Sequence, residues 1–187
     1  MEKIIWKSFL SFFLIWQSLF FGQSRADSSS FLKIRALQGN QSKANLKTST
    51  QSYLFYFGSF GIGLTEIDIK NETDSFKYDM KDLSLDLGFQ MTSSFSIGAG
   101  IHGQRTKAKA EEKNEDFYAW HSKKSSGYGI FANYGFNFGF LDFLLGVRSL
   151  RYSFEDFEHT SSVSTTILSK PVSGYSNLIS VGLGFNF

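Results

Sequence analysis

The chain has 187 residues, among them 22 phenylalanines, 17 glycines and one proline, and it contains no cysteine. The lack of cysteine excludes a disulfide-stapled scaffold, a thiolate metal site and a cysteine nucleophile. The formal net charge is +2, and Lys3, Lys7 and Arg25 against Glu2 supply that whole surplus, so the rest of the chain is neutral and offers no basic field for nucleic acid.

The N-terminal segment has the features of a secretory signal peptide. Two lysines precede an apolar run over residues 8–21, and the small residues Ser24 and Ala26 occupy the −3 and −1 positions of a cleavage site. The run has about 14 residues, whereas a membrane-spanning helix needs about 20. We therefore predict that residues 1–26 are removed and that residues 27–187 form one exported domain. A retained anchor is the alternative.

From residue 32 onward, apolar side chains alternate with small or polar ones, which is the period of a β-strand. The alternation predicts eight strands. Their apolar positions are, in chain order, Leu32, Ile34 and Ala36; Tyr53, Phe55 and Phe57; Phe60, Ile62 and Leu64; Leu83, Leu85, Leu87 and Phe89; Phe95, Ile97, Ala99 and Ile101; Tyr128, Ile130, Ala132, Tyr134, Phe136 and Phe138; Leu141, Phe143, Leu145 and Val147; and Tyr175, Ile179, Val181, Leu183, Phe185 and Phe187.

Two of these strands change phase along their length. After Leu64 the apolar positions slip toward Ile67, and after Val147 they take the other parity from Leu150 onward. An extra residue in one strand of a pair would produce such a switch. We therefore predict a β-bulge near Ser149.

The connections between the strands are alternately long and short. The long polar connections cover residues 39–47, 70–78, 107–125 and 156–172, and the short ones lie at residues 58–59, 91–94 and 139. An even meander with this alternation places all short turns at one end and all long loops at the other. The sequence thus predicts an all-β, eight-stranded antiparallel up-and-down transmembrane β-barrel. Unpaired backbone groups are costly in hydrocarbon, so the first strand is expected to pair with the eighth.

The chemistry of the second face distinguishes a membrane barrel from a soluble one, which would share the period. That face carries mainly Gly, Ser and Asn, whereas Lys and Glu are concentrated in residues 107–124. Small residues suit a narrow interior and the broad apolar face suits lipid, so we expect a polar interior plugged by side chains. Phenylalanines cluster beside the short turns, and Tyr78, Tyr128, Tyr152 and Tyr175 lie toward the long loops, which is typical of two interfacial girdles.

These features resemble the small outer-membrane barrels of the OmpA and OmpX type over residues 31–187. The most specific element is the ending, with its outward set of Tyr175, Ile179, Val181, Leu183, Phe185 and Phe187. In that family the barrel-assembly machinery reads such an ending, so the resemblance implies an insertion signal here. It also implies the outer membrane of a Gram-negative-type bacterium, with outer-membrane lipid and lipopolysaccharide as partners and a monomeric state. We expect no peptidoglycan-binding domain after the predicted barrel.

A few ionisable residues fall on the inward face at similar depth. We predict an ion-pair network centred on Arg148 and Asp86, in which buried charges stabilise one another. The predicted members are Arg35, Asp82, Asp86, His102 and Arg148. A functional alternative is that these charges gate a narrow conduit.

We predict no enzymatic activity, no catalytic residue, no metal site and no cofactor. Some small outer-membrane barrels that modify lipid A use a histidine with a serine and a carboxylate. Here His121 and His159 lie in predicted loops, and the inward-facing His102 could serve a neighbouring serine only if the lumen opened sideways.

Phe117, Tyr118 and Trp120 lie together in a predicted external loop. Exposed aromatic residues there would mark a contact surface for an extracellular partner or for lipopolysaccharide, and the alternative is that they fold back onto the rim. The sequence as a whole predicts an outer-membrane barrel with a structural or surface-interaction role. A narrow channel for small or hydrophobic solutes and a lipid A-modifying enzyme are the alternatives.

Overall fold

The computed structural model describes residues 31–187 apart from residues 44, 104, 113–118, 161–164 and 169–170. The predicted signal peptide at residues 1–26 lies outside the described residues, as do Phe117 and Tyr118. Over the described ranges, no helix has the length and apolar character needed to cross a membrane.

The described chain is built of antiparallel strands. Their bounds are β1 (Leu32–Lys43), β2 (Leu46–Phe57), β3 (Phe60–Glu72), β4 (Phe76–Gln90), β5 (Phe95–His102), β6 (Lys107–Glu112), β7 (Ala119–Ser122), β8 (Lys124–Phe138), β9 (Leu141–Glu155), β10 (Phe157–Thr160), β11 (Thr165–Leu168) and β12 (Val172–Asn186).

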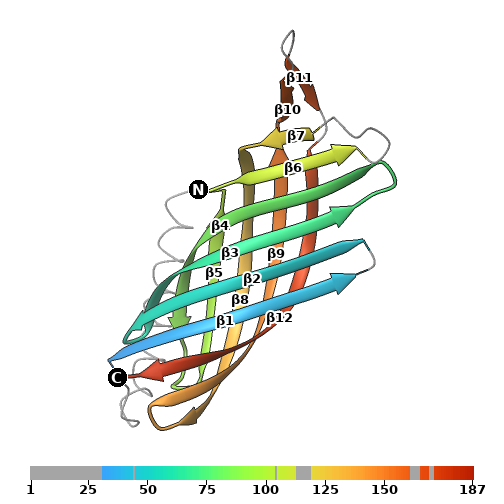
Figure 1. The fold of residues 1–187 in the computed structure, drawn as a ribbon. Coiled ribbons are helices and arrows are strands. Elements are labelled where there is room, and N and C mark those ends of the chain that lie inside the picture. The colour runs from blue at the N-terminus through green and yellow to red at the C-terminus, as the bar shows by residue number, and fades with distance from the viewer. Residues whose placement is uncertain (1–30, 44, 104, 113–118, 161–164, 169–170) are drawn as a thin grey trace, which may run out of the picture.

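Eight strands close into a ring in the order β1, β2, β3, β4, β5, β8, β9 and β12, and β12 returns to β1 (Figure 1). At the closing seam, Lys33 lies opposite Asn186 and Asn40 lies opposite Ile179. The Phe187 amide donates a hydrogen bond to the Leu32 carbonyl at 2.9 Å. The predicted eight-stranded up-and-down barrel and the pairing of its first and last strands are confirmed.

Four short strands continue the barrel wall at the end away from the C-terminus (Figure 1). β6 pairs with β4, β7 with β6, β10 with β7, and β11 with β10. Residues with positive φ mark two of the junctions: Gly103 (116°) before β6 and Asp156 (51°) before β10. The segments predicted as loops over residues 107–125 and 156–172 are therefore largely strands.

The other two connections predicted to be long are short, and that prediction is wrong. In place of the loop predicted at residues 39–47, residues 44–45 alone join β1 to β2. In place of the loop predicted at residues 70–78, residues 73–75 join β3 to β4. Polar composition suggested loops here, but most of these residues lie in paired strands whose outward side chains are exposed.

β9 has no bulge, so the bulge predicted near Ser149 is also wrong. Ser149 lies opposite Asn177 of β12 and Ile130 of β8 in uninterrupted ladders. The slip of the apolar positions after Leu64 is present, since Leu64 is exposed and Ile67 is buried, and it likewise involves no bulge: β3 pairs regularly with β2 through Asn71 and with β4 through Glu72. The strand pairing of β3 and β9 is therefore continuous, and what changes along these strands is which face, inward or outward, carries the apolar side chains.

The polarity of the wall inverts along the barrel. On β9, Phe143, Leu145 and Val147 point outward near the short turns and are exposed. Farther along, the outward position is taken by Arg151, and Tyr152 points inward and is buried. The short-turn half is thus apolar outside, and the loop-side half is apolar inside.

We call the apolar exterior of the short-turn half the belt. Its exposed members include Tyr53, Phe55, Phe57, Phe60, Ile62, Leu64, Leu85, Leu87, Ile97, Ile101, Tyr128, Ile130, Tyr134, Phe136, Phe138, Phe143, Leu145, Val147, Ile179, Val181, Leu183 and Phe185. The phenylalanine girdle at the short turns is present among them. They come from all eight ring strands except β1, on which Ile34 and Ala36 occupy the corresponding outward positions.

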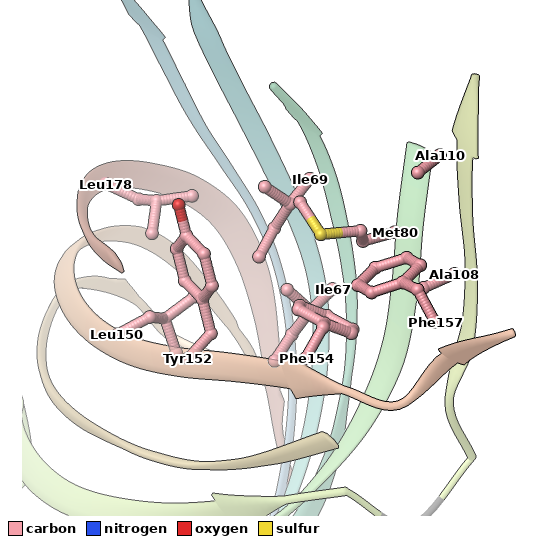
Figure 2. Close-up of a cluster of buried hydrophobic side chains, with 10 residues drawn as sticks. All are labelled: Ile67, Ile69, Met80, Ala108, Ala110, Leu150, Tyr152, Phe154, Phe157 and Leu178. Atoms are coloured by element: carbon pink, nitrogen blue, oxygen red, sulfur yellow. The ribbon is translucent and has the colours of Figure 1, made fainter. Parts of the chain in front are cut away.

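The interior of the loop-side half holds an apolar cluster, which we call the loop-side core. Figure 2 shows its side chains converging from several strands: Ile67, Ile69, Met80, Ala108, Ala110, Leu150, Tyr152, Phe154, Phe157 and Leu178. Tyr152 and the half-buried Tyr78, which packs against the cluster, therefore do not belong to an outer girdle as predicted. Tyr128 and Tyr175 do face outward and are exposed.

The loop-side core should contribute strongly to stability. Replacing the fully buried Phe154 by Ala should lower the free energy of unfolding by about 3–5 kcal/mol, because the ring leaves a cavity. The control is Ser153→Ala, next along β9 on the outward face, which should change it by less than about 0.5 kcal/mol. Urea titration in detergent measures both. Equal losses of unfolding free energy in Phe154→Ala and Ser153→Ala would contradict an apolar interior in the loop-side half.

Candidate functional site

The buried ionisable side chains of the short-turn half and the middle of the barrel point into its interior. All five residues predicted to form one inward network are buried: Arg35, Asp82, Asp86, His102 and Arg148. They do not form one network. The structure divides them among three clusters, which we call the central, lateral and short-turn clusters.

The central cluster joins β9 to β4 across the lumen. Arg148 forms a two-pronged ion pair with Asp86, with Nη2 to Oδ2 at 2.5 Å and Nη1 to Oδ1 at 3.3 Å. Thr65 and Ser84 donate hydrogen bonds to the same carboxylate at 2.6 and 2.8 Å. The guanidinium also lies over the Phe131 ring, 4.7 Å from its centroid. Both carboxylate oxygens are therefore fully engaged, which a buried charge requires.

Glycines on the neighbouring strand make room for this pair. Gly100 lies opposite Asp86 in the ladder, and a Cβ there would come within 1.9 Å of its Oδ1. At Gly98 a Cβ would come within 2.2 Å of the Phe131 ring. The inward glycines seen in the sequence therefore reflect the space that large inward side chains take in a narrow barrel.

The lateral cluster lies against the wall where β4, β5 and β8 meet. His102 Nδ1 is 2.9 Å from Asp82 Oδ2, and His102 Nε2 donates to the Arg151 carbonyl at 2.8 Å. Ser125 donates to the same carboxylate oxygen, and Thr106 donates to Asp82 Oδ1 at 3.3 Å. Both ring nitrogens of His102 are thus engaged by groups other than a serine.

The short-turn cluster contains the fifth predicted residue, Arg35. Its Nη1 donates to Ser96 Oγ at 2.8 Å, and its Nη2 is 3.8 Å from Asp142 Oδ2. The other oxygen of Asp142 accepts hydrogen bonds from the amides of Asn137 and Asn186 at 3.0 and 2.9 Å. Arg35 is therefore separate from the Arg148 and Asp86 pair that sequence reasoning placed it with.

Two further side chains tie the turn between β4 and β5 to the barrel end. Lys33 Nζ and Gln90 Nε2 each donate to the Ser93 carbonyl at 2.9 Å. Lys33 is buried although it lies at the start of β1. The turn at residues 91–94 is thereby held against the interior.

Sequence reasoning missed several partners of the predicted residues. Thr65 and Ser84 occupy inward positions of their strands, so alternation could have found them. Ser125 fell in a segment predicted as a loop, and Thr106 lies in the irregular stretch between β5 and β6. The Arg151 partner is a backbone carbonyl, which every residue has, so the sequence could not have pointed to it.

The other predicted residues lie on the outside or at the rim. The predicted insertion-signal residues all face outward on β12 or directly follow it: Tyr175, Ile179, Val181, Leu183, Phe185 and Phe187. Trp120 is half-buried and packs against the loop-side core, which agrees with the alternative that it folds back onto the rim. Phe117 and Tyr118 lie outside the described residues.

The loop-side exterior carries solvent-exposed charge pairs. A hydrogen bond and the negative charge of Asp156 raise the pKa of Lys124, and a hydrogen bond from Lys109 together with its charge lowers the pKa of Glu111. These four side chains are all well exposed. Such pairs contribute little to stability, because water screens them.

Two inward serines form hydrogen bonds to groups other than His102. Ser84 donates to Asp86, and Ser96 accepts from Arg35, so neither hydroxyl contacts His102. A base must lie within hydrogen-bond reach of its nucleophile, and this arrangement lacks that contact in the described interior. Nor do the described residues group three His, Asp or Glu side chains as a metal site.

The closed ring of eight antiparallel strands, apolar outside and charged within, defines a small outer-membrane β-barrel. Among solved structures, it is similar to Neisserial surface protein A, with a TM-score of 0.53 and 13% identity over 83% of this chain and 96% of that one. It also matches in-vitro folded OmpT, an outer membrane protein of Vibrio cholerae, with a TM-score of 0.29 and 11% identity over 86% of this chain and 53% of that one. At these identities the likeness concerns the fold alone.

No protein-family model and no curated protein matches the chain. The structural comparison therefore supports the barrel class, and it does not single out the OmpA and OmpX family.

The central pair can be tested by removing one partner. Arg148→Ala should lower the free energy of unfolding by about 3–5 kcal/mol, because it leaves Asp86 buried and uncompensated. The combined change Arg148→Met and Asp86→Leu should recover most of this loss, since no charge then remains unpaired. Urea titration of the refolded barrel measures both.

The matched control is Arg151→Ala on the outward face of the same strand, where the side chain stacks on Tyr175 with Cζ 5.6 Å from the ring centroid. Its effect should stay below about 1 kcal/mol. If Arg148→Ala were as mild as this control, the pair would not stabilise the barrel.

Proposed function

We propose that the protein is an integral outer-membrane β-barrel with a structural or surface-interaction role, that it is closed to solutes, and that it is not an enzyme. The inversion of polarity along the wall carries this proposal. Leu87 is 69% exposed, Ile130 59% and Ile179 67%. They belong to a belt that surrounds the short-turn half, whereas apolar patches on soluble monomers rarely exceed a few hundred Å². A bilayer covers such a belt.

The loop-side half supports the same placement. Its core faces inward and its charged residues face outward, as in a soluble domain. Strands that pass from lipid into water require this change at the boundary. We therefore propose that the loop-side half, including β10 and β11, stands outside the membrane and presents the surface available to an extracellular partner.

Contacts across the lumen support a closed interior. Arg35 on β1 reaches Ser96 on β5, which lies diametrically opposite in the ring. Arg148 on β9 reaches Asp86 on β4 at the next level. Eight strands leave room for little more than side chains. These contacts favour a plug over the narrow channel that the sequence left as an alternative.

The arrangement of the histidine supports a non-enzymatic role. Both ring nitrogens of His102 are hydrogen-bonded to Asp82 and to the Arg151 carbonyl, inside the barrel. A lipid substrate would meet the belt, whose members are aliphatic side chains, phenylalanines and the three tyrosines Tyr53, Tyr128 and Tyr134. The lipid A-modifying alternative thus finds no catalytic arrangement in the described residues.

Export and insertion complete the proposal. Residues 1–26 serve as a cleaved signal peptide, and the outward residues of β12 from Tyr175 to Phe187 serve as the signal for the barrel-assembly machinery. The barrel functions as a monomer, since closure leaves no ring strand unpaired, and its belt contacts outer-membrane lipid.

Two lysine substitutions on one face of β8 test the membrane placement. Ile130→Lys places a charge in the belt and should destabilise the inserted barrel by about 2–4 kcal/mol. Ser126 is the next outward residue of β8 beyond the belt, so Ser126→Lys should cost less than about 1 kcal/mol. The measurement is urea-dependent folding into lipid vesicles. Equal costs, or a wild type that stays folded and monomeric in plain buffer, would contradict the proposal.

Planar-bilayer recording tests closure. The wild-type barrel should insert without producing unitary current steps, because side chains fill its lumen. Insertion is verified separately by the difference in gel migration between boiled and unboiled samples. Reproducible steps from the folded, inserted protein would favour the narrow-channel alternative.

A further inference from the structure

The lateral cluster lies at a break in the backbone pairing of the barrel wall. β5 ends at His102, and β4 pairs with β5 only from Ser84 onward and with β6 only up to Lys81. On the far side of the break, β8 pairs with β5 as far as Gly127. Beyond that residue, its start at Lys124 pairs with β9 alone among the described strands. Just past the end of β5, the described ladders therefore leave β4 and β8 unconnected.

Side chains close this break in place of backbone hydrogen bonds. Asp82 of β4 is the common acceptor: it receives hydrogen bonds from Ser125 of β8, from Thr106 at 3.3 Å and from the Leu83 amide at 2.8 Å. The hydroxyl oxygens of Thr106 and Ser125 are themselves 2.6 Å apart. Asp82 and Thr106 are buried. The lateral cluster thus joins the start of β8 to β4 and to the residues that lead into β6.

The partners of His102 define its protonation state. Its Nδ1 lies 2.9 Å from a carboxylate oxygen of Asp82, and its Nε2 lies 2.8 Å from the Arg151 carbonyl oxygen. Both partners are acceptors, and only the imidazolium form carries a proton on each ring nitrogen. Gly127 makes room for this contact, because a Cβ there would collide with Nε2 and with the same carbonyl. The geometry therefore describes a buried imidazolium and carboxylate pair.

The other charged side chains of the adjoining elements do not replace this pair. Arg105, in the segment between β5 and β6, is exposed, and the Arg151 side chain of β9 points outward. Deeper in the lumen, Arg148 is paired with Asp86. Within the described interior, Asp82 is therefore the charged group that the His102 ring contacts.

Loss of one proton removes the match between the ring and its partners. A neutral imidazole has a single N–H, so one ring nitrogen would then face an acceptor with no proton between them. Buried away from water, two opposed acceptors cost more than the hydrogen bond that they replace. Histidine is the side chain whose charge changes near physiological pH. The closure of the break is therefore sensitive to pH.

We infer that the lateral cluster is a pH-sensitive latch between the two halves of the barrel. While His102 is protonated, the latch holds the start of β8 and the segment leading into β6 against β4. When His102 is neutral, these two segments loosen. The latch makes the loop-side surface respond to the external pH, and this consequence rests on the membrane placement proposed above.

The pH dependence of stability tests the latch. The chain has three histidines, so His121→Gln with His159→Gln leaves His102 as its one histidine. In this background the full mature chain is refolded in detergent and titrated with urea at about pH 5.5 and about pH 8.5, on either side of the usual range of histidine. Raising the pH should lower the equilibrium constant for folding roughly tenfold or more, because a charge-assisted hydrogen bond is lost.

Asp82→Asn, added to this background, should remove most of the pH dependence. The asparagine amide donates to an unprotonated Nδ1 while Nε2–H still donates to the Arg151 carbonyl, so the neutral ring is satisfied. A purely structural role of Asp82 would lower stability equally at both pH values. The matched control is Asp68→Asn on β3, whose carboxylate lies 3.6 Å from the exposed Lys81, and it should leave the pH dependence unchanged.

Spin labels locate the loosening. Because the chain has no cysteine, Lys107→Cys with Ser126→Cys places one label on each side of the break. Ser126→Cys with Ser153→Cys spans the uninterrupted ladder of β8 and β9 and serves as the control. In electron paramagnetic resonance, the distances of the first pair should broaden at the higher pH and those of the control pair should not. With Asp82→Asn, the first pair should give the same distances at both pH values.

Three results would each overturn the inference: stability that is independent of pH, a pH dependence that survives Asp82→Asn, or label distances across the break that do not change. Gel migration and vesicle insertion are recorded for every variant. If the barrel inserts and the latch does not respond to pH, the latch alone fails. If the latch responds and the barrel does not insert, the proposed membrane placement fails, and with it the link to an external surface.

Discussion

The structure depends on one constraint: every backbone amide and carbonyl of the belt region must find a partner within the sheet, because hydrocarbon supplies none. The pairing of β1 with β12 satisfies it, from Lys33 opposite Asn186 to Asn40 opposite Ile179. Closing a ring with eight strands leaves a lumen only about as wide as the side chains that enter it. The inward glycines and the buried charges both follow from that narrow lumen.

The surrounding medium then decides which side of the wall is apolar. The period of two is continuous along β9, from Phe143 outward in the belt to Phe154 inward in the loop-side core. In the belt the apolar side chains face lipid, and beyond it they turn away from water. A single register thus serves two environments.

The interior charges join walls that are far apart in the ring. Taking a guanidinium and a carboxylate out of water is costly, so each pair requires further hydrogen bonds. Asp86 obtains them from Thr65 and Ser84, and Asp142 from two asparagines. The pairs thus connect β9 to β4, and β1 to β9, within the lumen. Replacing a whole pair by apolar residues would cost much less than breaking it.

The sequence by itself determined the strand period, the outward belt and the inward charges, because each depends on alternation within a single strand. It also determined the eight-stranded ring, from the number of such strands and the need to pair the first with the last. It could not determine that Arg35 pairs with Asp142 and not with Asp86, since that depends on the stagger between distant strands. It also mistook the polar continuations of β1 to β4 for loops and a change of environment at Ser149 for a bulge. Only the closed tertiary structure decided these points, because strand register and the position of the water boundary are properties of the whole barrel.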